Sequence, residues 1–155
     1  MEIFKNNHMQ HKLYLAGPFF TPQQRHTAEL VEQACDHANL DAFSPRLRCF
    51  CPPNATHAQR RMTFDMNVTA IEKCDLVLAC IDDFDAGTMW EMGYAYALGK
   101  PIYAYSMVPG RGLNLMLAQS SAGFINGMEQ MTKFLGENGM VDFEAATKIH
   151  NGEII

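Results

Sequence analysis

The sequence has no concentrated basic tract, no long apolar run and no Cys-x-x-Cys pair. Its 12 lysines and arginines are outnumbered by 17 acidic residues, which gives a formal net charge of −5. Nucleic-acid binding requires a concentrated positive surface, so that class of partner is not expected. No apolar run is long enough to span a bilayer, and residues 1–11 lack the apolar core of a signal peptide. We therefore expect a soluble, cytoplasmic protein without a membrane partner.

The motifs of metal and cofactor sites are also missing. The cysteines number 5, an odd count, and without a secretion signal they are expected to be reduced thiols. Cys49 and Cys51 lie too close together for the usual zinc spacing, whereas Cys74 and Cys80 border or occupy an apolar run. No G-x-G-x-x-G, P-loop or G-x-S-x-G sequence occurs. We therefore expect no metal, nicotinamide cofactor or ATP.

Short apolar segments instead alternate with segments of helical periodicity. The predicted strands are residues 12–17, 41–44, 76–81, 102–107 and 123–125. The predicted helices are residues 22–39, 58–73, 87–98, 113–119 and 128–135. This alternation implies an α/β fold with a doubly wound parallel sheet and helices on both faces. We predict a single domain over residues 12–155, a polar arm at 1–11, a loop at 45–57 and a tail in the last twenty residues.

An acidic loop and the helix after it are the most informative part of the chain. The predicted strand at 76–81 leads into Asp82, Asp83 and Asp85, and the next helix carries Glu91 near its start. In open α/β sheets, ligands bind where strands end and helices begin. Carboxylates at such a place favour chemistry at an electron-poor carbon or contacts to an uncharged polar ligand. They would repel a phosphate.

Structural explanations compete with functional ones for these side chains. Thr88 and Glu91 have the spacing of a capping box, in which Glu91 would only reach back to the helix start. Asp85 precedes a glycine and is the best functional candidate of the loop, although acidic residues also cap helices.

Three further candidates lie outside this stretch. Asp65 could simply be an exposed residue of its helix, and Tyr14 a half-buried aromatic of the first strand. Asn114 stands at a predicted helix start, where its side chain could serve as a cap.

Taken together, these segments resemble the nucleoside 2-deoxyribosyltransferase family. The matching segments are Tyr14-Leu15-Ala16-Gly17-Pro18-Phe19, Asp65, Asp85-x-Gly87-Thr88-x-x-Glu91-x-Gly93-Tyr94-Ala95 and Leu113-Asn114-Leu115-Met116. They follow the order of the family at close to its spacing and cover roughly residues 12–135. The resemblance implies a flavodoxin-like sheet of five parallel strands.

The resemblance also implies a mechanism. Glu91 would attack the anomeric carbon of a 2′-deoxynucleoside and form a covalent deoxyribosyl-enzyme, which a second nucleobase then attacks from the opposite face. Two inversions give net retention. Asp65 and Asp85 would bind the base and manage its proton, and Tyr14 would position Glu91. The substrate-binding residues implied are Gly17, Phe19, Gly87, Asn114 and Met116.

The substrates implied by the resemblance are 2′-deoxynucleosides and free nucleobases, with no cofactor. It further implies a homo-oligomer built from dimers, as a dimer, tetramer or hexamer, with Asn114 reaching the sugar 5′-hydroxyl across the subunit contact. Two alternatives stay open. One is a 2′-deoxynucleoside 5′-monophosphate N-glycosidase, which carries small hydroxyl residues in place of Asp85 and Asn114. The other is a non-catalytic nucleotide-sensing module, in which Glu91 only caps its helix.

Overall fold

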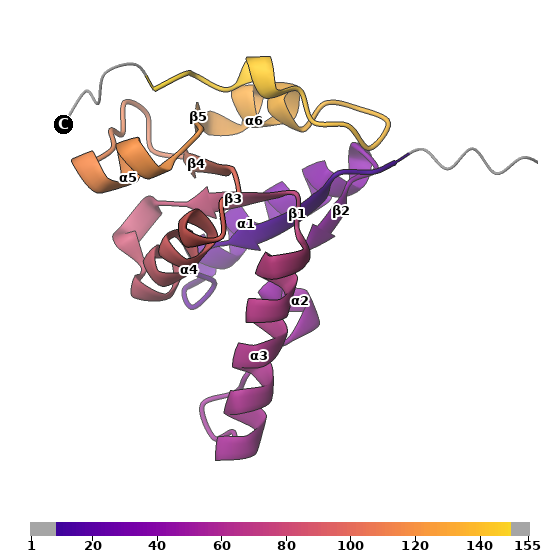
Figure 1. Ribbon diagram of the computed structural model, residues 1–155, viewed down its shortest axis with the longest axis vertical. Helices are drawn as coiled ribbons and strands as arrows, with labels where there is room; N and C mark the ends of the chain where they lie inside the picture. Colours follow the sequence, from indigo (N-terminus) through magenta and orange to yellow (C-terminus); the bar gives the residue numbers. More distant parts are fainter. Residues whose placement is uncertain (1–8, 150–155) are drawn as a thin grey trace, which may run out of the picture.

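Five parallel strands form one sheet in the order β2-β1-β3-β4-β5 (Figure 1). Their bounds are β1 Lys12–Ala16, β2 Asp41–Phe43, β3 Leu76–Cys80, β4 Ile102–Ser106 and β5 Gly123–Asn126. The computed structural model describes residues 9–149. This strand order is the flavodoxin-like, doubly wound one, so the predicted fold class is confirmed. All five residues of β3 and of β4 are buried, because helices cover both faces of the sheet.

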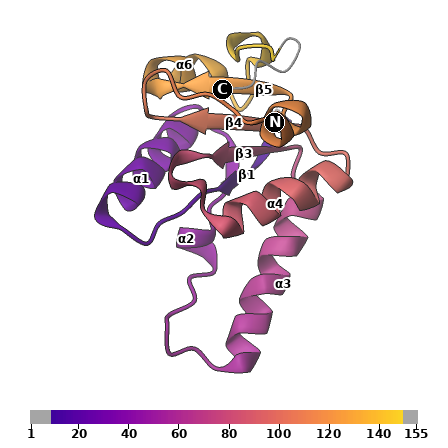
Figure 2. The ribbon, with the colours of Figure 1, turned by 90° about the vertical axis from the view of Figure 1, so that its left-hand side faces the viewer.

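The helices divide between the two faces of the sheet (Figure 2). Their bounds are α1 Pro22–His37, α2 Pro45–Arg48, α3 His57–Lys73, α4 Ala86–Ala97, α5 Leu115–Ser120 and α6 Gly127–Leu135, with 3₁₀ turns η1 Asp82–Phe84 and η2 Phe143–Ala145. On one face, α1 and α6 bury Val31 and Phe134 against the sheet. On the other face, α3 and α4 contribute Ile71 and Met92 to a second core, which α5 completes with Leu117.

Three segments are more structured than the sequence predicts. The loop predicted at 45–57 begins with the short helix α2. Thr147, within the predicted tail, forms an antiparallel bridge with Phe124 of β5. At the end of the predicted polar arm, the backbone N–H of Val141 donates to His11 Nδ1 at 3.0 Å, and the His11 ring packs against Phe143. The rest of the predicted arm, 1–8, and residues 150–155 lie outside the described residues.

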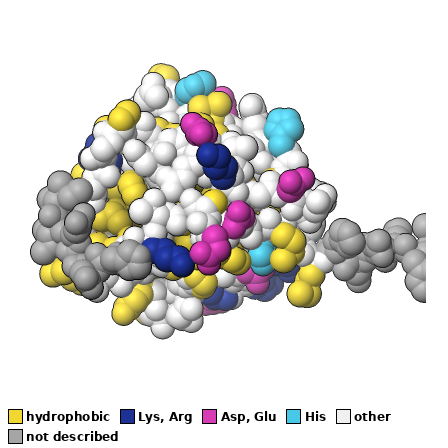
Figure 3. Space-filling model, turned by 90° about the horizontal axis from the view of Figure 1, so that it is seen from above, with side chains coloured by type: hydrophobic (Ala, Val, Ile, Leu, Met, Phe, Trp, Pro, Cys, Tyr) yellow, Lys and Arg dark blue, Asp and Glu magenta, His cyan; other side chains and the backbone are white. Residues whose placement is uncertain are grey.

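The long helix α3 extends beyond the edge of the sheet (Figures 1 and 2). Its exposed side chains include Met62, Phe64 and Met66, so it is apolar on more than its core-facing side. None of the helices that the structure describes is long and apolar enough to cross a membrane. On the face seen in Figure 3, acidic and basic side chains are interspersed.

Candidate functional site

The carboxyl ends of β1 and β3 lie side by side at the point where the chain changes face. From β1 the chain continues into α1 on one face, and from β3 it continues through η1 into α4 on the other. Ligands of doubly wound sheets bind at this switch point. Here the site is formed by Tyr14 of β1, on the α4 face, and Glu91 of α4.

The start of α4 shows that Glu91 is not a capping residue. The helix begins at Ala86, and the carboxylate of Asp85 accepts hydrogen bonds from the backbone N–H of Thr88 at 2.8 Å and from its hydroxyl at 3.0 Å. The predicted capping box of Thr88 and Glu91 is therefore wrong, because Thr88 is already inside the helix. Glu91 lies in the second turn, and its carboxylate is free for another role.

The turn before this cap is held in an unusual conformation. Asp83 and Phe84 both have positive φ angles, 65° and 46°, which is rare for residues other than glycine. Two side chains from other segments hold it: Gln24 of α1 donates to Asp83 at 3.0 Å, and the guanidinium of Arg111 lies over the Phe84 ring. Such strain persists only where the surroundings enforce it, and here it fixes the place of Asp85.

Tyr14 and Glu91 form the centre of the site. Tyr14 has no exposed surface, and both its hydroxyl and Glu91 Oε2 are buried without a hydrogen-bond partner of ordinary geometry among residues 9–149. The two groups are nevertheless close enough for the hydroxyl to lower the pKa of the carboxyl. Buried polar atoms without partners are rare, so this pair is suited to receive the polar groups of a ligand.

The titration of Glu91 follows from this setting. Burial raises its pKa, the Tyr14 hydroxyl opposes that rise, and the nearby charge of Asp85 adds to it, so that the pKa is raised from 4.5 to about 7. Glu91 therefore carries a charge on a substantial fraction of molecules near neutral pH. A carboxylate in this range can act as a nucleophile or exchange a proton.

Replacing Tyr14 by phenylalanine tests the contact between these two groups. The hydroxyl stabilises the charged form of Glu91, so its removal is expected to move the acidic limb of the pH–rate profile of kcat/KM to higher pH. Loss of the interaction between this hydroxyl and the charged carboxylate should also reduce activity about 10–100-fold at pH 7. Steady-state kinetics between pH 5 and 9 measures both changes. An unshifted acidic limb would show that Tyr14 does not act on the titration of Glu91.

Two residues that sequence analysis did not select also belong to the site. Cys49, which follows α2, donates from its thiol to Asn67 Oδ1 of α3 at 2.8 Å. Burial raises the pKa of the Cys49 thiol, and the negative charge of Glu91 raises it further, so Cys49 lies within reach of that charge. The signal that could have found Asn67 is its position one turn before the buried Ile71, on the inward side of α3.

Asp65 is not brought to Glu91 within one chain. It is exposed and pairs with Arg61 of the same helix at 3.1 Å. It lines a groove of about 850 Å³ between α3 and the strands β1 and β2, together with Lys12. Because residues two apart on a helix point about 200° apart, Asp65 faces away from the side on which Asn67 lies. The role of Asp65 in handling the base stays a prediction.

The glycine and aromatic candidates lie around the switch point. Gly17 and Phe19 follow β1, and the Phe19 ring packs 6.4 Å from that of Phe50, next to Cys49. A Cβ atom on Gly87 would come within 3.1 Å of Asp85 Oδ2, so glycine leaves space for the capping carboxylate.

The two candidates at the start of α5 are at the surface. Asn114 caps α5 by accepting from the backbone N–H of Leu117 at 2.9 Å, as its structural alternative predicts. Met116 is 74% exposed. In the described part of the chain, no hydrogen bond joins Asn114 to Glu91, Tyr14 or Asp85. Between residues 9 and 149 there is also no group of three His, Cys, Asp or Glu side chains arranged to hold a metal ion.

Two substitutions of Asp85 separate its capping role from its electrostatic role. Asparagine keeps an acceptor for the N–H of Thr88, so Asp85→Asn is expected to retain stability while lowering the pKa of Glu91 through loss of the neighbouring charge. Alanine removes both, and should lower the free energy of unfolding by about 1 kcal/mol. Urea unfolding and pH–rate profiles of the two variants measure these effects. Equal loss of stability in both variants would contradict the capping role.

The sequence profile of nucleoside 2-deoxyribosyltransferases matches residues 13–140, most of the chain. This chain belongs to that family. A solved structure of a 2-deoxyribosyltransferase from Bacillus psychrosaccharolyticus is similar, with a TM-score of 0.75 and 28% identity over 90% of this chain and 98% of that one. The family match includes Tyr14, Asp85, Glu91 and Asn114.

More distant similarities involve other members of this fold. A conserved protein from Enterococcus faecalis V583 matches with a TM-score of 0.56 and 23% identity, covering 87% of this chain and 93% of that one. A CMP N-glycosidase from Clostridium botulinum matches with a TM-score of 0.54 and 21% identity, covering 74% of this chain and 87% of that one. At these identities the two structures show the shared fold alone. An uncharacterized protein from Ureaplasma parvum serovar 3 is 32% identical over 100 residues, which are 59% of this chain and 63% of that protein, a little under two thirds of its length.

Proposed function

We propose that this protein transfers the 2-deoxyribosyl group between nucleobases by a retaining double displacement through a covalent intermediate on Glu91. The observation that carries the proposal is the carboxylate of Glu91, which its own helix does not use and whose Oε2 is buried without a partner beside the Tyr14 hydroxyl. Membership of the family and likeness to a solved 2-deoxyribosyltransferase support the same reaction.

The proposed reaction has two displacements. Ionised Glu91 attacks the anomeric carbon, the N-glycosidic bond breaks, and its electron pair leaves with the base, which takes up a proton. In the second step a free base loses a proton as its nitrogen attacks the same carbon, and the ester to Glu91 breaks. We assign proton handling and base contacts to Asp85, whose charge acts on Glu91, and to Asn67, whose side chain contacts Cys49. Tyr14 holds the carboxylate in place.

The charges of the site favour a nucleoside over a nucleotide. Asp85 and Glu91 are close enough for the charge of one to raise the pKa of the other. Two neighbouring carboxylates would repel a 5′-phosphate. This is the observation that favours transfer between nucleosides over the alternative of a 2′-deoxynucleoside 5′-monophosphate N-glycosidase. A role in nucleoside salvage in the cytoplasm follows from the proposal.

The proposal includes a homo-oligomer built from dimers, in which Asn114 of one subunit serves the site of another. Its support is the exposure of Asn114 and Met116 and the apolar surface of α3, which carries exposed Met62 and Phe64. We expect light scattering after size-exclusion chromatography to show the mass of at least a dimer. Met62→Glu should weaken the association of the subunits about tenfold or more. A monomer with full activity at nanomolar concentration would contradict a shared site.

A two-substrate assay tests the proposed reaction. Purified protein is incubated with thymidine or deoxyinosine, with and without free adenine, beside Glu91→Ala. Deoxyadenosine that forms only with the unaltered protein is the expected result. Free base released equally without adenine would indicate a hydrolase, and deoxynucleoside monophosphates would then be the substrates to test. No reaction with either substrate class would refute the enzymatic proposal and favour a sensing module.

A further inference from the structure

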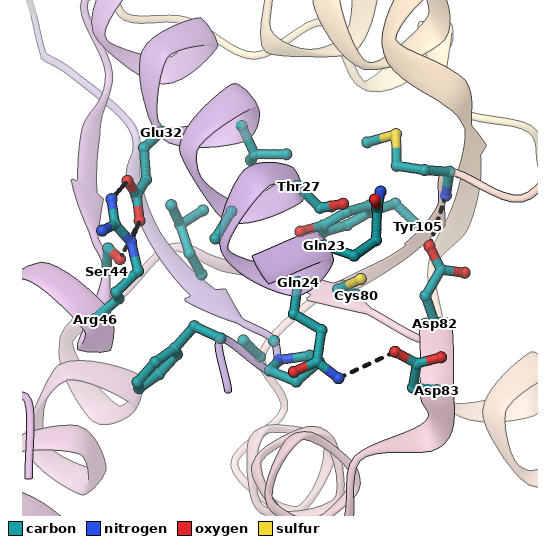
Figure 4. A pocket seen from close by; sticks show the side chains of 18 of the residues that line it. Gln23, Gln24, Thr27, Glu32, Ser44, Arg46, Cys80, Asp82, Asp83 and Tyr105 are labelled. Atoms are coloured by element: carbon teal, nitrogen blue, oxygen red, sulfur yellow. Dashed lines mark hydrogen bonds and ion pairs between the residues drawn. The ribbon is translucent and has the colours of Figure 1, made fainter. Parts of the chain in front are cut away.

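A second cavity lies on the face of the sheet opposite Glu91. It has a volume of about 200 Å³ and lies between α1 and the carboxyl ends of β1, β3 and β4 (Figure 4). Tyr14 and Glu91 do not line it, because their side chains lie on the α4 face. Gly17 and Phe19, which the resemblance assigns to substrate binding, do line it, so the cavity borders the switch point from the face opposite Glu91.

A buried hydroxyl points into this cavity. Tyr105 of β4 is 4% exposed, and its side chain extends beneath α1 toward Thr27 and Cys80 (Figure 4). Burial and the neighbouring Cys80 thiol raise the pKa of this hydroxyl, and thiols are weak hydrogen-bond partners. A Cβ atom on Gly17 would lie 3.1 Å from Cys80 Cβ and 3.9 Å from Tyr105 Oη, so the glycine keeps space in front of the hydroxyl. The hydroxyl is thus left available to a ligand.

The arginine that lines the cavity, Arg46, is already paired with a carboxylate. Arg46 binds the buried carboxylate of Glu32 through two nitrogens, at 2.5 and 3.1 Å, and Ser44 donates to the same carboxylate at 2.7 Å. This cluster lies at one end of the cavity (Figure 4). An anionic ligand would therefore find no free cation there.

The other end of the cavity is rich in hydrogen-bond acceptors. Asp82 is held by the Ser106 hydroxyl and by the backbone N–H of Met107 and lies 4.0 Å from Arg111 Nε, and Asp83 accepts from Gln24 at 3.0 Å. Each carboxylate oxygen has more than one lone pair, so both aspartates can accept further N–H donors. With the amide of Gln23, this end suits an uncharged ligand that presents N–H groups.

We propose that this cavity is a second binding site, specific for a free nucleobase that carries an exocyclic amino group, such as adenine. A volume of about 200 Å³ is below the ~300–1,000 Å³ typical of sites for larger small molecules, so a single heterocycle is the matching size. Carboxylates accept hydrogen bonds from base amino groups, side-chain amides pair with adenine edges, and the Tyr105 hydroxyl donates to a ring nitrogen. Binding there needs no covalent chemistry at Glu91, although the cavity shares Gly17 and Phe19 with the substrate-binding residues that the resemblance implies.

Calorimetric titration of the full chain with adenine tests this proposal. We expect two binding events per chain if the site around Glu91 also binds free base. In Tyr105→Phe, the binding event at this cavity should weaken about tenfold or more, as loss of one hydrogen bond predicts. Tyr103→Phe is the matched control, because Tyr103 is also buried on β4 but packs against Phe134 outside the cavity. Thymine, which lacks the amino group, is expected to bind this site at least tenfold more weakly than adenine.

The outcomes separate the cavity from the reaction. One adenine site that Tyr105→Phe weakens and Tyr103→Phe does not would support the cavity even if base exchange is absent. Adenine binding that Tyr105→Phe leaves unchanged would overturn the proposal, whatever the activity at Glu91. Equal affinity for thymine and adenine at the Tyr105-dependent site would overturn the assigned class of ligand.

Discussion

Replacing Glu91 by glutamine is expected to lower base exchange about 10³-fold or more, because the amide cannot form the covalent intermediate. The side chain keeps its size, so the surrounding core of Tyr14 and Met92 should stay in place. Exchange between thymidine and adenine, followed by chromatography, measures the loss. Glu129→Gln is the matched control, since Glu129 lies on the surface of α6 with its side chain 88% exposed. Exchange by Glu91→Gln at more than a tenth of the unaltered rate would refute the role of Glu91.

The same substitution is expected to stabilise the fold at alkaline pH. The pKa of Glu91 is raised from 4.5 to about 7, so the folded protein binds this proton more tightly than the unfolded chain does. The resulting stabilisation is fully present below pH 4.5 and is lost as the pH rises through 7. Above that range the protein retains a buried charge that glutamine would not have. Glu91→Gln should therefore raise the free energy of unfolding by about 2–3 kcal/mol at pH 8.

Urea unfolding of both proteins at pH 4.5 and pH 8 measures this difference. The gain from glutamine should shrink toward pH 4.5, where the unaltered carboxyl is protonated in the folded state. A gain that is the same at both pH values would show that Glu91 does not titrate with a raised pKa. Together with the activity loss, a stabilised but inactive variant would indicate that the buried carboxylate is retained for chemistry rather than for folding.

The fold could be predicted because hydrophobic patterning acts locally and repeatedly. Each predicted strand and long helix has its counterpart, and the fully buried β3 corresponds to the apolar run at 76–81. The start of α4 could not be predicted because Asp85 and Thr88, three residues apart, both have side chains that cap helices. Only the backbone conformation shows that Asp85 is the N-cap of α4, because the strained turn at Asp83 and Phe84 ends directly before it.

The site was partly accessible from sequence for a similar reason. Tyr14 lies in the first strand, and Glu91 lies near the start of the helix that follows the neighbouring strand. These two places are adjacent in any doubly wound sheet, so the proximity of the two residues follows from topology. The contact of Cys49 with Asn67 joins two segments 18 residues apart, and no local pattern signals it. The sequence of α3 does not show which of its polar side chains face the core, because the helix has little amphipathic character and exposes apolar side chains as well.

The most direct test of the account is to trap the intermediate on Glu91. A 2′-deoxy-2′-fluoronucleoside is suited to this, because the electron-withdrawing fluorine slows breakdown of the glycosyl ester. After incubation without acceptor base and acid quenching, peptide mass spectrometry should find one sugar on the peptide that contains Glu91, and adding adenine before the quench should remove it. Base exchange by the unaltered protein with no sugar on this peptide, or with the sugar on another residue, would contradict the account.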